Sequence, residues 1–126
     1  MTLAAQITNI KEVERGTPIS YNRRWAAKRR THIATVGIGY ADGYPRSLLG
    51  KAEVGIAGRR HPVVGTICMD MIMVDLGPEP PAVSVGDHVV LFGRGGPDVS
   101  DVADWADTIS YEIICGLGKR VERQFS

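Results

Sequence analysis

The sequence has few of the residues that build disulfide frameworks or metal centres. It contains only two cysteines, Cys68 and Cys115, and neither belongs to a C-x-x-C pair. The three histidines, His32, His61 and His88, are far apart in the chain. Disulfide-rich secreted domains and structural zinc sites need closely spaced sets of these residues. We therefore expect neither a disulfide framework nor a metal site.

Several common catalytic and membrane signatures are also missing. The sequence has no G-x-S-x-G motif, and its glycine-rich GRGGPD segment lacks the lysine of a phosphate-binding loop. The run GIGYAD lacks the third glycine of a dinucleotide-binding motif. No uncharged apolar run reaches the length of a membrane span, and the first residues, MTLAAQITNIKEVERG, do not resemble a signal peptide. These absences predict a cytoplasmic protein.

The charge is nearly balanced, with a net value of +1, so no strong field favours nucleic acid or a membrane surface. The segment YNRRWAAKRR is the exception, because five basic residues surround Trp25. Such a patch can bind phosphates. A solvated edge formed by two strands and a turn explains it more simply, since the basic residues are confined to this segment.

What the sequence does contain is a succession of short strand-like segments. Its 126 residues, 44% of them apolar, fit one domain spanning residues 1–126. Apolar, β-branched segments separated by glycine and proline predict six to eight strands. These segments are LAAQITNIKEV, THIATVGIG, KAEVGIAG, RHPVVGTI, MIMVDLG, SVGDHVVLFG and KRVERQF. The fold class expected is mostly β and barrel-like.

Near the C-terminus the pattern changes to helical spacing. The segment VADWAD fits a short helix capped by Ser100 or Asp101. The segment YEIICGLG fits a second helix, capped by Thr108 or Ser110 and closed by glycine. A short helical pair is therefore expected to follow the strands.

Polar and aromatic residues stand at the ends of several apolar segments. They are Tyr21, Tyr40, Asp42, Cys68, Met69, Asp70 and Tyr111. If the strands form a barrel, one rim can collect several of them, as binding residues are often carried on loops of a rigid scaffold. The plainer interpretation is that the tyrosines are rim aromatics with wet hydroxyls, Met69 is core, and Asp70 starts a turn. The residues alone leave both interpretations open and favour the plainer one.

Two ordered motifs favour the first interpretation. The run VGIGYADGYPR, followed by VVGTICMDMIMVDL, strongly resembles the C-terminal domain of alanine racemases. The resemblance extends from the ISY segment through VSVGDHVVLFG and ISYEI to the closing GKRV, which is nearly the whole chain.

The resemblance implies a two-part enzyme. Family members carry an N-terminal α/β barrel that holds pyridoxal phosphate on a lysine, followed by a C-terminal β domain. Two chains pair head to tail as a homodimer, so that each active site combines one barrel with the partner's C-terminal domain. The implied reaction interconverts L- and D-alanine, and it supplies D-alanine for peptidoglycan.

The resemblance also implies roles for five of these residues. Tyr21 corresponds to the catalytic tyrosine that exchanges the α-proton of L-alanine. The backbone of Met69 would contact the substrate carboxylate, with Asp70 beside it. Tyr40 would narrow the entrance as a gate, and Tyr111 would bind the cofactor phosphate.

A cofactor-binding barrel does not fit in 126 residues, so this chain is expected to be inactive alone. None of its lysines (Lys11, Lys28, Lys51 and Lys119) lies in a context that resembles the cofactor lysine. Two other functions remain open: a stand-alone β-barrel that binds a partner or ligand, and a racemase domain for another amino acid such as serine.

Overall fold

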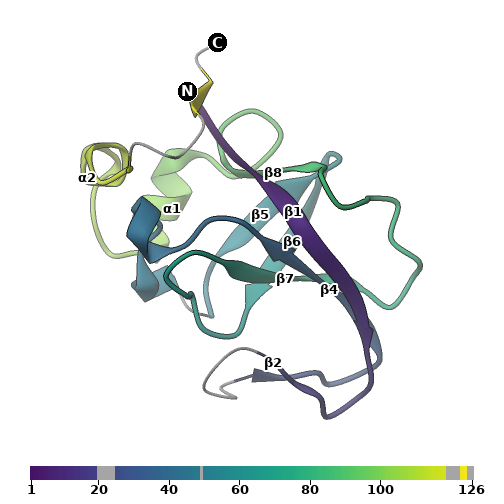
Figure 1. The fold of residues 1–126 in the computed structure, drawn as a ribbon. Helices are drawn as coiled ribbons and strands as arrows, with labels where there is room; N and C mark the ends of the chain where they lie inside the picture. Colours follow the sequence, from purple (N-terminus) through teal and green to yellow (C-terminus); the bar gives the residue numbers. More distant parts are fainter. Residues whose placement is uncertain (20–24, 49, 119–122, 125–126) are drawn as a thin grey trace.

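Six antiparallel strands close into a barrel in the computed structural model, which describes residues 1–19, 25–48, 50–118 and 123–124. The strands are β1 (Thr2–Val13), β4 (Thr31–Val36), β5 (Glu53–Ile56), β6 (Arg59–Val64), β7 (Ile72–Gly77) and β8 (His88–Phe92). They follow one another around the barrel as β4, β7, β6, β5, β8 and β1, and β1 returns to β4 (Figure 1). This arrangement confirms the predicted mostly-β barrel.

The long strand β1 closes the barrel because its two halves pair with different neighbours. Its first half pairs with β8, with Leu3 opposite Phe92. Its second half pairs with β4, from Ile7 opposite Val36 to Val13 opposite Thr31. Closure leaves no open edge between these six strands, which removes the usual route to edge-to-edge aggregation.

Three short strands lie outside the barrel. β9 (Arg123–Gln124) pairs with the start of β1. β2 (Pro18–Ile19) and β3 (Trp25–Ala26) form a separate pair beside the barrel. The basic residues that follow β3 are exposed, and Arg30 forms an ion pair with Glu12 at 2.8 Å. For Lys28, Arg29 and Arg30 this local structure agrees with the predicted solvated edge, whereas Arg23 and Arg24 lie outside the described residues.

The core consists of inward-facing residues from every barrel strand. Fully buried examples are Leu3, Val36, Val54, Ile72 and Leu91. Alternation of apolar and polar residues along antiparallel strands puts such residues on one face. The barrel interior is therefore packed with side chains rather than hollow.

The helical elements gather on one side of the barrel, where Figure 1 shows them together. They are the 3₁₀ helices η1 (Tyr40–Asp42) and η2 (Arg46–Leu48), and the α-helices α1 (Val99–Trp105) and α2 (Ser110–Cys115). Val102 and Ile113 anchor the α-helices to the core. In the part of the chain that the structure describes, no helix is both long and apolar enough to span a bilayer.

Both helices exist as predicted, but they begin at other residues. α1 is preceded by Asp98 rather than by Ser100 or Asp101. Asp101 instead lies in the first turn, where its carboxylate accepts a hydrogen bond from the Asp98 N–H at 3.1 Å. α2 begins after Ile109, whose side chain cannot cap a helix.

Candidate functional site

The residues predicted from the sequence lie on three segments of the helical side. Tyr40 begins η1, Met69 and Asp70 lie in the loop between β6 and β7, and Tyr111 lies in α2. Tyr21, the predicted catalytic residue, lies outside the described residues.

Backbone contacts join the Tyr40 bend to the Met69 loop. The Tyr40 N–H donates to the Cys68 carbonyl at 2.9 Å, and the Ala41 N–H donates to the Met69 carbonyl at 3.0 Å. Gly39 makes this approach possible, because a Cβ there would overlap the backbone of Cys68 and Met69. The two loops therefore form one unit.

The other side of η1 contacts the end of α2. Gly43 follows η1 with φ 98°, and a Cβ at this position would overlap the backbone of Gly116. The Gly118 N–H donates to the Asp42 carbonyl at 2.8 Å. η1 thus lies between the Met69 loop and the C-terminal end of α2. Glycine is therefore required at Gly39 and Gly43, because another backbone segment approaches each of them closely.

The predicted side chains on these segments are open to solvent. Tyr40 is 43% exposed, Met69 57% and Tyr111 74%, and Asp70 is also exposed. Ile109, which directly precedes α2, is 66% exposed. Large apolar side chains are usually covered, so several exposed ones on adjoining segments favour a surface that contacts another molecule or domain.

Two further residues of the GYADGYPR segment enter the site's structure. The guanidinium of Arg46 lies 5.3 Å from the centroid of the Tyr40 ring, a cation–π contact between the first residues of η1 and η2. Asp42 is almost fully buried and orders η1 through its carboxylate. Neither role was predicted from the sequence, although Asp42 was among the polar residues at the ends of apolar segments. For Arg46, the available signal was an arginine directly after Tyr-Pro. For Asp42 there was none, because Asp-Gly is indistinguishable from an ordinary surface turn.

The hydroxyl of Tyr111 remains a donor at neutral pH. A hydrogen bond with the Cys115 side chain, one helical turn further on, raises the pKa of the Tyr111 hydroxyl. A phenol normally ionises near pH 10, so a higher value keeps the proton in place. Its single O–H can donate to an anion such as a phosphate when it turns away from Cys115.

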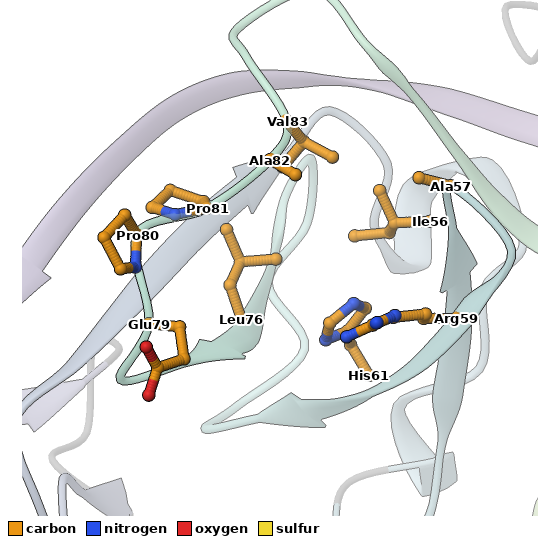
Figure 2. A pocket seen from close by; sticks show the side chains of 10 residues that line it. All are labelled: Ile56, Ala57, Arg59, His61, Leu76, Glu79, Pro80, Pro81, Ala82 and Val83. Carbon is orange, nitrogen blue, oxygen red and sulfur yellow. The ribbon is translucent and has the colours of Figure 1, made fainter.

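Two pockets of the described surface are lined by other residues. Figure 2 shows one of about 280 Å³ between the β5–β6 hairpin and the proline-rich loop after β7. Arg59 and His61 lie on one wall and Glu79 on the other. A second, of about 410 Å³, lies between the segment around Pro45 and the turn that joins α1 to α2. None of the predicted site residues lines either pocket.

The chemistry that the described residues offer is incomplete by itself. They supply a phenol, an exposed carboxylate and backbone hydrogen-bonding groups. Within these same ranges no cluster of three or more histidine, cysteine or acidic side chains can hold a metal ion. The arrangement can bind and shape one side of a site whose remaining groups come from elsewhere.

Comparison with known proteins gives a consistent result. Residues 1–125 match the family model described as alanine racemase, C-terminal domain. The alanine racemase of Deinococcus radiodurans is 50% identical over 125 residues, covering 98% of this chain and 35% of that protein. The relative from Deinococcus deserti is 51% identical, covering 98% and 34%.

Solved structures agree with the sequence relatives. The alanine racemase of Clostridium difficile 630 in complex with cycloserine superposes with a TM-score of 0.89 at 42% identity, covering 96% of this chain and 32% of that one. The biosynthetic alanine racemase from Pseudomonas aeruginosa gives 0.90 at 40% identity, covering 100% and 35%. The chain therefore spans about a third of the length of these relatives.

Proposed function

Because the chain belongs to the family of alanine racemase C-terminal domains, we propose that it completes the active site of an alanine racemase that uses pyridoxal phosphate. The rest of that enzyme is an N-terminal α/β barrel carrying the cofactor lysine. The enzyme is proposed to be a cytoplasmic homodimer in which this domain faces the barrel of the partner. Its product, D-alanine, would serve peptidoglycan synthesis.

One observation carries the proposal. The backbone contacts of η1 hold the Tyr40 bend and the Met69 loop together, and both Tyr40 and Met69 expose their side chains. The stability of the barrel alone does not require two loops to be joined so that each exposes a large apolar side chain. A surface that closes over a ligand held by another domain does require such an arrangement.

Each residue has a distinct task in the proposed site. The backbone of Met69 binds the substrate carboxylate, and Asp70 lies beside it on the way in. Tyr40 narrows the entrance, with its ring held by Arg46. These residues bind and orient the substrate and limit its size, which favours a small amino acid such as alanine.

The described residues fit one contact with the cofactor. The exposed hydroxyl of Tyr111 suits a hydrogen bond to its phosphate, for which its single O–H would turn from Cys115 toward the phosphate. The remaining phosphate contacts would come from the barrel. When bound, the cofactor supplies the electron sink that makes the α-proton of an amino acid removable.

Tyr21 is the proposed acid–base residue for the L enantiomer. Racemisation needs a proton acceptor on each face of the planar centre, and the cofactor lysine would serve the D face. The pKa of an ordinary phenol is near 10, so bringing it to about 7 takes roughly 4 kcal/mol at about 1.36 kcal/mol per pKa unit. Neighbouring cations stabilise the phenolate in this way. We assign most of this effect to the barrel.

The test uses the full-length protein with Tyr21→Ala and Tyr21→Phe. Both variants should lower racemisation by about 10² to 10⁴, the usual worth of one acid–base group. In deuterated water, α-proton exchange of D-alanine should persist in both variants, whereas exchange of L-alanine should nearly vanish.

The phenylalanine variant separates chemistry from packing, because it keeps the ring and removes only the hydroxyl. If the α-proton exchange rates of L- and D-alanine fell equally and only modestly, Tyr21 would be removed from the mechanism. If the wild-type protein racemised serine faster than alanine, its substrate would be serine. No racemisation of either amino acid would leave a stand-alone binding barrel as the function.

A further inference from the structure

We propose that Asp42 is a positioning residue that holds Tyr40, the Met69 backbone and the end of α2 in one geometry. The inference rests on the proposed function and adds to it a residue that touches neither substrate nor cofactor. It concerns the only acidic residue among those described whose side chain is buried in the core region beside the site.

Asp42 contacts its surroundings through both side chain and backbone. Its Oδ2 accepts a hydrogen bond from the Gly39 N–H at 3.0 Å, and its own N–H donates to the Gly39 carbonyl at 3.0 Å. Its carbonyl accepts the Gly118 N–H at 2.8 Å. Only 1% of the residue is exposed. The carboxylate thus fixes the turn that begins η1, and the carbonyl ties that turn to the chain beyond α2.

The turn that Asp42 fixes also determines where the Met69 loop lies. The N–H groups of Tyr40 and Ala41 bond the carbonyls of Cys68 and Met69 only while Gly39 and Asp42 keep their present geometry. The two segments are in direct backbone contact, because a single added Cβ at Gly39 would overlap the backbone of Cys68 and Met69. A shift of the turn must therefore displace the Met69 backbone.

η1 is packed equally closely on the side of α2. Gly43 packs against the Gly116 backbone as closely as Gly39 packs against the Met69 loop. A loosened η1 would release the end of the helix that carries Tyr111. One buried carboxylate thereby couples a substrate contact to a cofactor contact.

The charge of Asp42 is part of the proposal. A carboxylate accepts a stronger hydrogen bond from a backbone N–H than a neutral amide oxygen does. Asp42→Asn keeps the shape and one acceptor oxygen but removes the charge. Asp42→Ala removes the acceptor altogether.

The chain offers a matched control in α1. There Asp101 accepts a hydrogen bond from the N–H of the residue three positions earlier, Asp98, at 3.1 Å. This contact has the same form as that of Asp42 with Gly39, but it lies at the start of α1 and is partly exposed. Asp101→Asn therefore removes an equivalent charge and weakens an equivalent bond away from Tyr40 and Met69.

The first measurement is amide hydrogen exchange in the full-length protein. Asp42→Asn should speed exchange of the Tyr40, Ala41 and Gly118 amides together, by at least about tenfold, since local opening sets these rates. The Val63 amide, bonded to the Ala52 carbonyl at 2.9 Å in the barrel wall, should keep its rate. Asp101→Asn should leave all four amides unchanged.

The second measurement is steady-state kinetics with both enantiomers. A displacement of about 1 Å at a positioning contact can cost about 10²-fold. We expect Asp42→Asn to lower kcat/KM by about 10- to 100-fold, mainly through KM and equally for L- and D-alanine. Asp101→Asn should retain wild-type kinetics.

The outcomes distinguish the two proposals. Unchanged exchange at the three amides in Asp42→Asn would overturn the positioning role, whatever the activity. A drop in thermal stability with normal kinetics would assign Asp42 a structural role only. If the wild-type protein does not racemise alanine, the proposed function fails, while hydrogen exchange still decides whether Asp42 couples the three segments. Should Asp42→Ala fail to fold, the isosteric Asp42→Asn still provides the test.

Discussion

The two tyrosines of the GYADGYPR segment, four residues apart, have opposite surroundings. Tyr40 exposes 43% of its surface, whereas Tyr44 exposes 2%. The Tyr44 hydroxyl is buried and has no hydrogen-bond partner among the described residues. Burial without a partner disfavours the charged form, and desolvation raises the pKa of the Tyr44 phenol. One tyrosine is free to serve a site, and the other fills the core beneath it.

Replacing Tyr44 with phenylalanine should stabilise the protein at neutral pH. Removing a buried, unpartnered hydroxyl recovers its desolvation cost, so we expect a gain of about 1 kcal/mol in the free energy of unfolding. Urea denaturation at pH 7 measures this change. A loss of more than 1 kcal/mol would instead show that the hydroxyl has a stabilising partner.

The same variant should alter the response to alkali. The folded protein holds the Tyr44 proton to higher pH than the unfolded chain, whose tyrosines ionise near pH 10. Above about pH 10 the unfolded state therefore binds fewer protons, and wild-type stability falls by up to about 1.4 kcal/mol per pH unit. Denaturation series from pH 8 to 11 should show a shallower decline for Tyr44→Phe. Parallel curves would contradict the assigned pKa shift.

At the scale of elements, the strands could be predicted and the boundaries of the helices could not. The run THIATVGIG is rich in β-branched residues and indeed forms the buried strand β4. The start of α1 was misplaced because Asp98, Ser100 and Asp101 all have the chemistry of a cap. Spacing alone cannot choose between them, since the choice depends on how Val102 reaches the core.

Candidate site residues could be chosen from the sequence only where they stand in a motif. Tyr40 and Met69 were proposed in this way, and the structure joins their segments through backbone hydrogen bonds. The roles of Asp42 and Arg46 depend on contacts between segments, which no local pattern reports. The closure of the barrel through the two halves of β1 is likewise a non-local result.

The β5–β6 hairpin offers a prediction at this scale. Ala57 and Gly58 form its turn with φ of 51° and 81°, which is the pattern of a type I′ turn. A left-handed backbone is costly for alanine and easier for asparagine. Ala57→Asn should therefore raise the free energy of unfolding by about 0.5 kcal/mol, and thermal denaturation measures it.

Gly58→Ala is the matched control for this turn. An added Cβ there meets no atom within 4 Å, so any loss reports backbone strain rather than a clash. We expect a loss of about 1 kcal/mol or more. Equal stability of the two variants would mean that the turn relaxes to another type.

At the scale of the whole molecule, the exposed large apolar residues are concentrated on the helical elements and the loop bonded to them. Tyr40, Met69, Ile109, Tyr111 and Ile114 all belong to this group. Among the described residues Val85 is the exception, because it lies in the loop before β8. The barrel thus buries its own core and presents its remaining apolar surface beside the candidate site. In the proposed enzyme this surface faces a barrel.

Oxidative footprinting can test that arrangement by comparing the 126-residue chain with the full-length protein. Hydroxyl radicals label methionine and aromatic side chains in proportion to their exposure. In the separate chain, Met69 at 57% and Tyr111 at 74% exposure should be modified readily. In the full-length protein both should be protected, because the proposed assembly covers them. The peptide that contains Val85, 60% exposed in a loop outside the site, should be modified equally in the two samples. Equal modification of Met69 and Tyr111 would show that this surface stays open in the assembled enzyme, so that the apolar side chains must serve a partner other than the barrel.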